Sequence, residues 1–159
     1  MIGCHAAAAL AAAGHRVVAL VRDPEKLTRV MAPFAAGSRV EARQGDITDR
    51  ASVERALSGC EGLLHGAGIF SHSRGDAELL EAVNVRGAQT VLQTGHEAGL
   101  SRMLFVSSAM AIFTPGLARQ QASDPIAITN NMYSSSKARA ERAARALQEG
   151  GAPLVIVYP

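Results

Sequence analysis

Short apolar, β-branched runs alternate with segments of helical pattern along the whole chain. Five such runs predict strands, at residues 16–21, 39–43, 62–65, 103–106 and 154–157. Helices are predicted between them, at 4–13, where Gly14 closes the helix, at 25–31, after the capping loop 45–49 through Leu57, at 77–98 and from 133 onward. Strands that alternate with helices of this length indicate a parallel sheet with helices on both faces. The sequence therefore predicts one doubly wound α/β domain over residues 1–159, with one long irregular stretch at 113–131.

Charge and cysteine usage exclude several classes of function. The 16 basic and 14 acidic residues are spread along the chain and aromatic residues are few, which argues against a nucleic-acid partner. Cys4 and Cys60 have no metal or redox spacing, and no two histidines stand at helical ligand spacing. We expect no metal site and no disulfide framework, and a reducing compartment fits this composition.

The alanine-rich run at residues 6–13 is apolar but too short to span a bilayer. No basic segment precedes it, as a secretory signal would require. We therefore expect a cytoplasmic protein with no membrane partner.

Tyr133 and Lys137 stand four residues apart in a run rich in Ala, Arg, Glu and Leu, which are strong helix formers. Residues four apart share a helix face, and an ammonium beside a phenol favours the phenolate. Such a pair can serve acid–base chemistry. Taken alone, the pair more often reflects a packed tyrosine beside a solvated lysine.

In doubly wound folds ligands bind beyond the carboxyl ends of the strands. The residues that follow the predicted strands are Arg22, Asp46, Gly66–Gly68 and Ser107–Ser108. A hydroxyl of the serine pair could meet the phenol of Tyr133, although serines at this place also cap helices and turns.

Taken together, eight segments resemble the extended short-chain dehydrogenase/reductase family, in particular its dihydroflavonol-reductase-like and NAD-dependent epimerase/dehydratase branch. Any one of them is weak evidence, but all occur in the family's order and spacing. They are Ile2–His5, Gly14–Pro24, Gly45–Asp49, His65–Gly68, Asn84–Gly87, Val106–Ala109, Tyr133–Lys137 and Val157–Pro159.

The resemblance implies a catalytic role for four residues. Tyr133 would be the general acid or base, and Lys137 would favour its ionised form and hold the nicotinamide ribose. Ser108 would bind the reacting oxygen; we choose it over Ser107 because the family's catalytic hydroxyl is the last before a small-residue segment. Asn84 would help to order the site, although an asparagine in a helix can also be purely structural.

The resemblance also implies which residues hold the cofactor. Arg22 follows Val21, where NAD-binding relatives place an acid, and an arginine there suits a 2′-phosphate. We therefore expect NADP, with NAD as the alternative because Asp23 could partly neutralise Arg22. The residues implied in cofactor binding are Gly3, Arg22, Asp46, Ile47, Gly66, Ala67, Gly68, Ser107, Tyr133, Lys137 and Pro159.

The chain departs from the family pattern at both ends. Gly3 corresponds to the last glycine of the family's G-x-x-G-x-x-G turn, and members continue beyond Pro159 into a substrate-binding region. We expect an incomplete Rossmann-type NAD(P)-binding fold that lacks its first strand and leaves its strands in two groups. Alone, it should be unstable and bind dinucleotide poorly.

The resemblance leaves three functions open for the parent protein. The first is an NADP-dependent oxidoreductase acting on a small carbonyl or alcohol substrate. The second is a nucleotide-sugar epimerase or dehydratase with the same Tyr–Lys chemistry, and the third is a non-catalytic NAD(P)-binding sensor or an inactive fragment. A homodimer is plausible from the family.

Overall fold

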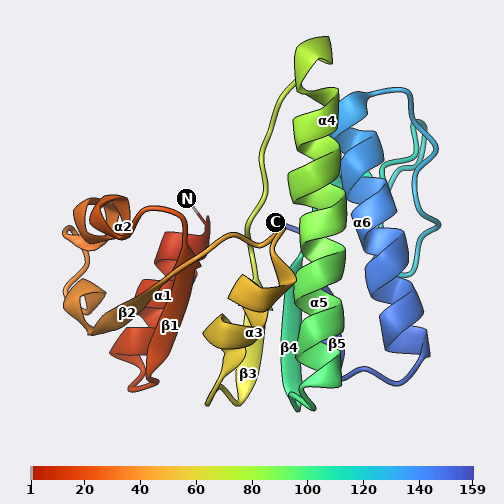
Figure 1. The fold of residues 1–159 in the computed structure, drawn as a ribbon. Helices are drawn as coiled ribbons and strands as arrows, with labels where there is room; N and C mark the ends of the chain where they lie inside the picture. Colours follow the sequence, from red (N-terminus) through yellow and green to blue (C-terminus); the bar gives the residue numbers. More distant parts are fainter. Residues whose placement is uncertain (1) are drawn as a thin grey trace. The chain divides into compact units, whose positions relative to one another are not determined.

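The computed structural model describes residues 2–159, which divide into two compact units (Figure 1). Unit 1 ends at Ser58, and unit 2 comprises Gly59–Pro159. All five strands pair in parallel, but they form two sheets, one of two strands in unit 1 and one of three strands in unit 2. The parallel α/β architecture predicted from the sequence is confirmed, and so is the expected separation of the strands into two groups.

Unit 1 contains the helices α1 (Ile2–Ala12), α2 (Pro24–Met31) and α3 (Arg50–Leu57) and the strands β1 (Val17–Val21) and β2 (Val40–Gln44). Strand β1 pairs with β2 from Val17 opposite Val40 to Val21 opposite Gln44. Asp23 and Asp49 cap α2 and α3, since their carboxylates accept hydrogen bonds from backbone amides of the first turn. Gly14 ends α1 at a φ of +92°, a conformation that side-chain-bearing residues rarely adopt.

Unit 2 contains strands β3 (Gly62–His65), β4 (Arg102–Val106) and β5 (Leu154–Val157) in the order β3-β4-β5. The connection from β3 to β4 carries a 3₁₀ turn at Arg74–Asp76 and one helical run made of α4 (Ala77–Leu80), a π-helical segment (Glu81–Gly87) and α5 (Ala88–Glu97). The connection from β4 to β5 carries a 3₁₀ turn at Ala109–Ala111, the long loop and α6 (Met132–Glu149).

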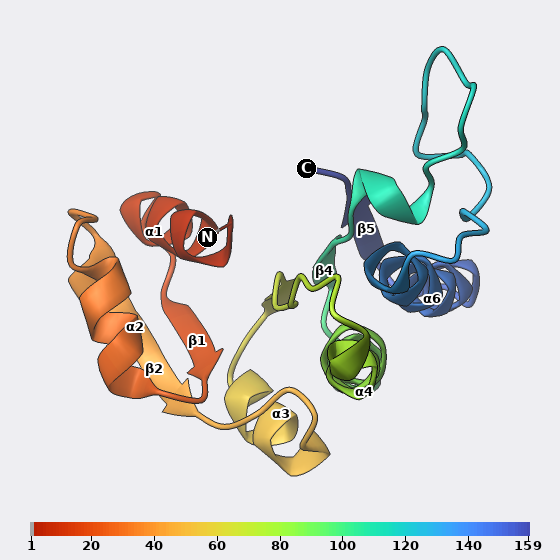
Figure 2. The ribbon, with the colours of Figure 1, turned by 90° about the horizontal axis from the view of Figure 1, so that it is seen from above.

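Helices α5 and α6 pack against each other and against the sheet of unit 2. Figure 2 shows the α4–α5 run and α6 side by side, with the long loop extending beyond them. Met103, Phe105 and Leu154 are almost wholly buried and supply the apolar core. This packing fixes the end of β4 relative to the N-terminal half of α6, which is where the candidate site lies.

Two features of the fold refine the sequence prediction. The helix expected at 77–98 is present, but seven of its residues are π-helical, a local widening that often marks functional sites. None of the described helices has the length and apolar character needed to cross a membrane.

Candidate functional site

Tyr133 and Lys137 lie in the first turns of α6, one turn apart on the same face, as the sequence predicted. The helix begins there because Asn131 caps it: its Oδ1 accepts a hydrogen bond of 3.0 Å from the Ser134 amide. Tyr133 is partly buried and its ring packs edge-on against Phe70, with 4.7 Å between ring centroids. Within residues 2–159 its hydroxyl has no hydrogen-bond partner.

Lys137 is 6% exposed and directs its ammonium at the end of β4. Its Nζ donates to the carbonyl oxygen of Val106 at 3.1 Å and lies 5.0 Å from the centre of the Phe105 ring. Burial lowers the pKa of Lys137 to about 8, against the opposing charge of Glu141. An ammonium has three donor protons, and the described protein groups use one of them. The other two can bind hydroxyl or carbonyl oxygens of a ligand.

Ser107 and Ser108 follow β4 and have different surroundings. Ser107 is buried; its hydroxyl donates to Glu141 Oε2 at 2.5 Å and its amide donates to the Val157 carbonyl at 2.9 Å. Ser108 is more exposed, and its Oγ accepts a weak hydrogen bond of 3.3 Å from the Met110 amide. Ser108 therefore caps the 3₁₀ turn and keeps its hydroxyl proton available. No hydrogen bond joins Ser108 to Tyr133 among the described residues.

Asn84 lies in the π-helical segment, where it is 3% exposed, and its amide binds two segments. Its Oδ1 accepts from the Ile69 amide at 2.8 Å, and its Nδ2 donates to the Ile69 carbonyl at 2.9 Å. Nδ2 also donates to Ser136 Oγ at 3.0 Å, and that hydroxyl donates to the Tyr133 carbonyl at 2.7 Å. Asn84 thus connects the loop that follows β3 to the turn of α6 that carries Tyr133.

Gly66, Ala67 and Gly68 form an exposed loop directly after β3. A Cβ atom at Gly68 would lie 3.3 Å from Asn84 Oδ1, closer than ordinary packing allows. The glycine therefore lets the loop backbone approach Asn84 and leaves its outer side open to a ligand.

Four of the residues expected to bind cofactor belong to unit 1. Gly3 is exposed in the first turn of α1, and Arg22 is exposed just after β1. Asp46 Oδ1 accepts hydrogen bonds from the Thr48 amide at 2.9 Å and from the Thr48 hydroxyl at 2.8 Å. Ile47, the residue between them in the sequence, is partly buried. These bonds, chiefly the one from the Thr48 amide, hold the pKa of Asp46 below its usual range, and the charge of Arg22 acts in the same direction.

The remaining expected residues are in unit 2, where the structure brings Lys137 to the strand end that carries Ser107 and Ser108. Pro159 is exposed at the end of the chain. The sequence reasoning missed three buried polar residues beside this group: His65, Ser136 and Glu141. A signal for Glu141 was present, because Tyr133, Lys137, Glu141 and Arg145 repeat at four-residue spacing and so share one helix face.

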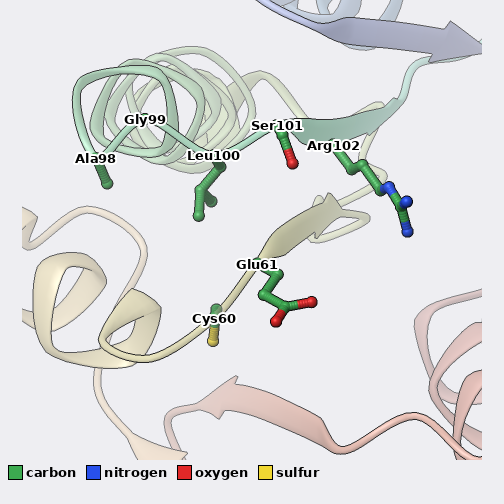
Figure 3. Close-up of a pocket in the computed structure, with 7 residues that line it drawn as sticks. All are labelled: Cys60, Glu61, Ala98, Gly99, Leu100, Ser101 and Arg102. Atoms are coloured by element: carbon green, nitrogen blue, oxygen red, sulfur yellow. The ribbon is translucent and has the colours of Figure 1, made fainter.

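A hollow at the opposite end of β3 and β4 is separate from this group. Figure 3 shows its lining, which consists of Cys60, Glu61 and residues 98–102, at the point where the two strands begin. The candidate site lies where the same strands end, at the edge that binds ligands in parallel sheets.

Comparisons with known proteins agree with the fold. The model of the NAD dependent epimerase/dehydratase family matches residues 1–159. A putative dihydroflavonol 4-reductase of Synechocystis is 30% identical over 152 residues, which cover 92% of this chain and 42% of that protein. A UDP-glucose 4-epimerase of Neisseria meningitidis is 28% identical over 147 residues, covering 89% of this chain and 43% of that protein.

Among solved structures, a short-chain dehydrogenase/reductase superfamily protein of Agrobacterium tumefaciens, determined with bound NAD, superposes with a TM-score of 0.82 at 25% identity. The match covers 99% of this chain and 45% of that one. The chain therefore spans about half the length of the relatives it matches.

Parallel strands joined by helices, together with the likeness to a solved dehydrogenase/reductase structure, define a Rossmann-type NAD(P)-binding fold. This chain belongs to the NAD-dependent epimerase/dehydratase family, the extended branch of the short-chain dehydrogenases/reductases.

The residues of unit 2 fit a nicotinamide cofactor. Two donor protons of the buried Lys137 ammonium and the hydroxyl of Tyr133 are not used within the described protein. A buried cation with unused donors is costly unless a ligand accepts from it, and ribose hydroxyls are suitable acceptors.

Proposed function

We propose that the full-length protein is an NADP-dependent oxidoreductase that reduces a carbonyl group of a small-molecule substrate, or oxidises the corresponding alcohol. The observation that carries this proposal is the placement of Lys137. Its buried ammonium lies on the helix face of Tyr133 and is fixed to the last residue of β4, next to Ser107 and Ser108.

In the direction of reduction, a nicotinamide cofactor bound to the protein supplies the hydride. Tyr133 holds a proton on its Oη and donates it to the substrate oxygen as that oxygen gains charge. The ammonium of Lys137 stabilises the phenolate that remains. Ser108 donates a hydrogen bond from its hydroxyl to the same substrate oxygen and keeps its proton. Asn84 holds the Tyr133 turn against the loop after β3.

The preference for NADP rests on Arg22. Its side chain is exposed immediately after β1, where a guanidinium can bind a 2′-phosphate. Affinities of the full-length protein for NADP and NAD, measured with and without Arg22→Ala, test this point. We expect the variant to lose affinity for NADP alone; equal affinities of the unchanged protein would refute the preference.

A second candidate is a nucleotide-sugar epimerase or dehydratase. The family model and the Neisseria epimerase support it, because the model matches residues 1–159 and the epimerase is 28% identical to this chain, against 30% for the Synechocystis reductase. Incubation with NADPH and a panel of aldehydes and ketones separates the two functions. A reductase consumes one NADPH for each alcohol formed, whereas an epimerase or dehydratase converts UDP- or dTDP-glucose without net consumption.

A cofactor sensor without catalysis, or an inactive fragment, ranks third because Tyr133, Lys137 and Ser108 are all present. We propose further that the two units are parts of one NAD(P)-binding domain over residues 1–159. The homodimer and the cytoplasmic location expected from the sequence stay predictions.

A further inference from the structure

Helix α6 carries an ion pair, Glu141 with Arg145, that begins one turn beyond Lys137. Glu141 is wholly buried, and its carboxylate oxygens have separate partners. Oε2 accepts the Ser107 hydroxyl at 2.5 Å. Oε1 accepts Arg145 Nη2 at 2.7 Å and the Tyr158 hydroxyl at 2.7 Å. A fully buried carboxylate is normally retained only where such partners compensate its desolvation.

We propose that Glu141 is a positioning residue, which holds Ser107 inward so that Ser108 presents its hydroxyl at the end of β4, and which balances the buried charge of Lys137. Only the expected effect of Glu141 on catalysis rests on the proposed function. The contacts of Glu141 with the strand end do not depend on it.

The direction of Ser108 follows from the backbone. Ser108 is extended, with φ −157° and ψ 144°, and neighbouring side chains in extended chain point to opposite sides. Because Ser107 is fixed on the α6 side by Glu141, Ser108 must face away from that contact. The next residues begin the 3₁₀ turn, in which the Ala111 amide donates to the Ser108 carbonyl at 2.9 Å. Loss of the Ser107 contact should loosen this turn.

Arg145 extends the same network to the long loop. Its Nη1 donates to the Asp124 carbonyl at 2.9 Å and its Nη2 to the Ala122 carbonyl at 3.0 Å. Figure 2 shows that this loop begins at the 3₁₀ turn after β4 and returns to the start of α6. The network therefore joins the loop, α6 and the segment after β5 at the carboxylate of Glu141.

The charge of Glu141 also bears on Lys137. Burial lowers the pKa of Lys137 to about 8, and the negative charge of Glu141, one turn away, opposes that decrease. The other titratable groups around the pair are His65 on β3, Tyr133 and Arg145 on α6, and Tyr158 after β5. Burial lowers the pKa of His65 to about 4, so at neutral pH His65 adds no positive charge beside Lys137. Glu141 is the acidic group that acts on Lys137.

The test compares Glu141→Gln and Ser107→Ala with Glu149→Gln, an exposed change at the far end of the same helix. Amide hydrogen exchange measures the local stability of the 3₁₀ turn. We expect both test variants to lower the protection of the Met110 and Ala111 amides by about tenfold, and the control to leave it unchanged.

The pH dependence of reductive methylation at Lys137 measures the effect of the Glu141 charge on the Lys137 ammonium. Glu141→Gln should move the midpoint of this dependence to lower pH, and Ser107→Ala should not.

Both readouts are made without substrate or cofactor, so they stand if the proposed function fails. With a reducible carbonyl substrate, Glu141→Gln should also lower kcat and shift the pH profile of kcat while KM changes little. Unchanged amide protection in Ser107→Ala overturns the inference, even if Glu141→Gln does not fold. An unchanged Lys137 midpoint in folded Glu141→Gln overturns its electrostatic half. A loss of stability with neither effect would make Glu141 a structural residue only.

Discussion

Replacement of His65 by phenylalanine should remove much of the acid sensitivity of unit 2. His65 ends β3, is 3% exposed and stacks on Phe105 at 5.7 Å between ring centroids. Its Nε2 has no hydrogen-bond partner among the described residues. Burial lowers its pKa from 6.5 to about 4, and the charge of Lys137 acts in the same direction. A phenyl ring keeps the stacking and removes the titrating group.

The sign and size of the effect follow from proton linkage. The folded state binds fewer protons than the unfolded state between pH 4 and 6.5, so the stability from a neutral His65 is present above 6.5 and lost as pH falls through 4. At about 1.4 kcal/mol for each factor of ten in proton affinity, this loss amounts to about 3 kcal/mol. At neutral pH, His65→Phe should be as stable as the unchanged protein or about 1 kcal/mol more stable, because an unpaired buried nitrogen is removed.

Tyrosine fluorescence is a selective probe for this measurement. The chain has no tryptophan, and its two tyrosines, Tyr133 and Tyr158, are both in unit 2. Urea unfolding of the chain at about pH 7 and about pH 4 gives the change in the free energy of unfolding. We expect that change to be about 3 kcal/mol smaller in His65→Phe than in the unchanged chain, and His72→Gln serves as the matched exposed control. An equal change in the free energy of unfolding in His65→Phe and in the unchanged chain would refute the reasoning. A His65 imidazole that titrates near pH 6.5 by NMR would refute it as well.

Two further predictions concern residues that hold the site. Asn84→Ala leaves the Ile69 amide and carbonyl without their partner, and we expect urea unfolding to show a loss of about 2–4 kcal/mol; a loss below about 0.5 kcal/mol would contradict the role of Asn84. Between pH 8 and 10.5 the free energy of unfolding of the unchanged protein should rise by up to about 3 kcal/mol, because Lys137 loses its proton at lower pH in the folded state than in the unfolded state. Lys137→Met should remove this rise. Unfolding curves with the same pH dependence in both proteins would show that Lys137 is not desolvated.

Local signals in the sequence predicted most of the fold. Asp23, Asp49 and Gly14 lie at helix ends, and such residues are readable from sequence because capping depends on a few neighbouring backbone groups. The two strands β3 and β5 have the predicted bounds, because short apolar runs between glycine, proline and polar residues leave little choice of register. The π-helical segment was missed. Its residue Asn84 bonds to Ile69 and to Ser136, 15 and 52 residues away in the chain, and no local pattern reports such contacts.

The candidate site was predictable in part. The spacing of Tyr133 and Lys137 gave their common face, but not that the ammonium binds the Val106 carbonyl. The choice of Ser108 over Ser107 stays a prediction; the structure supplies a physical reason for it, because Glu141 takes the Ser107 hydroxyl. That contact joins residues 34 apart in the chain, and no local pattern reports such a pairing.

The central claim is that Tyr133, beside the buried ammonium of Lys137, transfers the proton in a carbonyl reduction. The most direct test measures NADPH consumption by the full-length protein with aldehydes and ketones, for the unchanged protein and for Tyr133→Phe, with the exposed α6 variant Arg142→Ala as control. The account predicts stoichiometric consumption by the unchanged protein and the control, and a decrease of kcat by about 10²-fold or more in Tyr133→Phe with cofactor affinity retained. Full activity of Tyr133→Phe would contradict it.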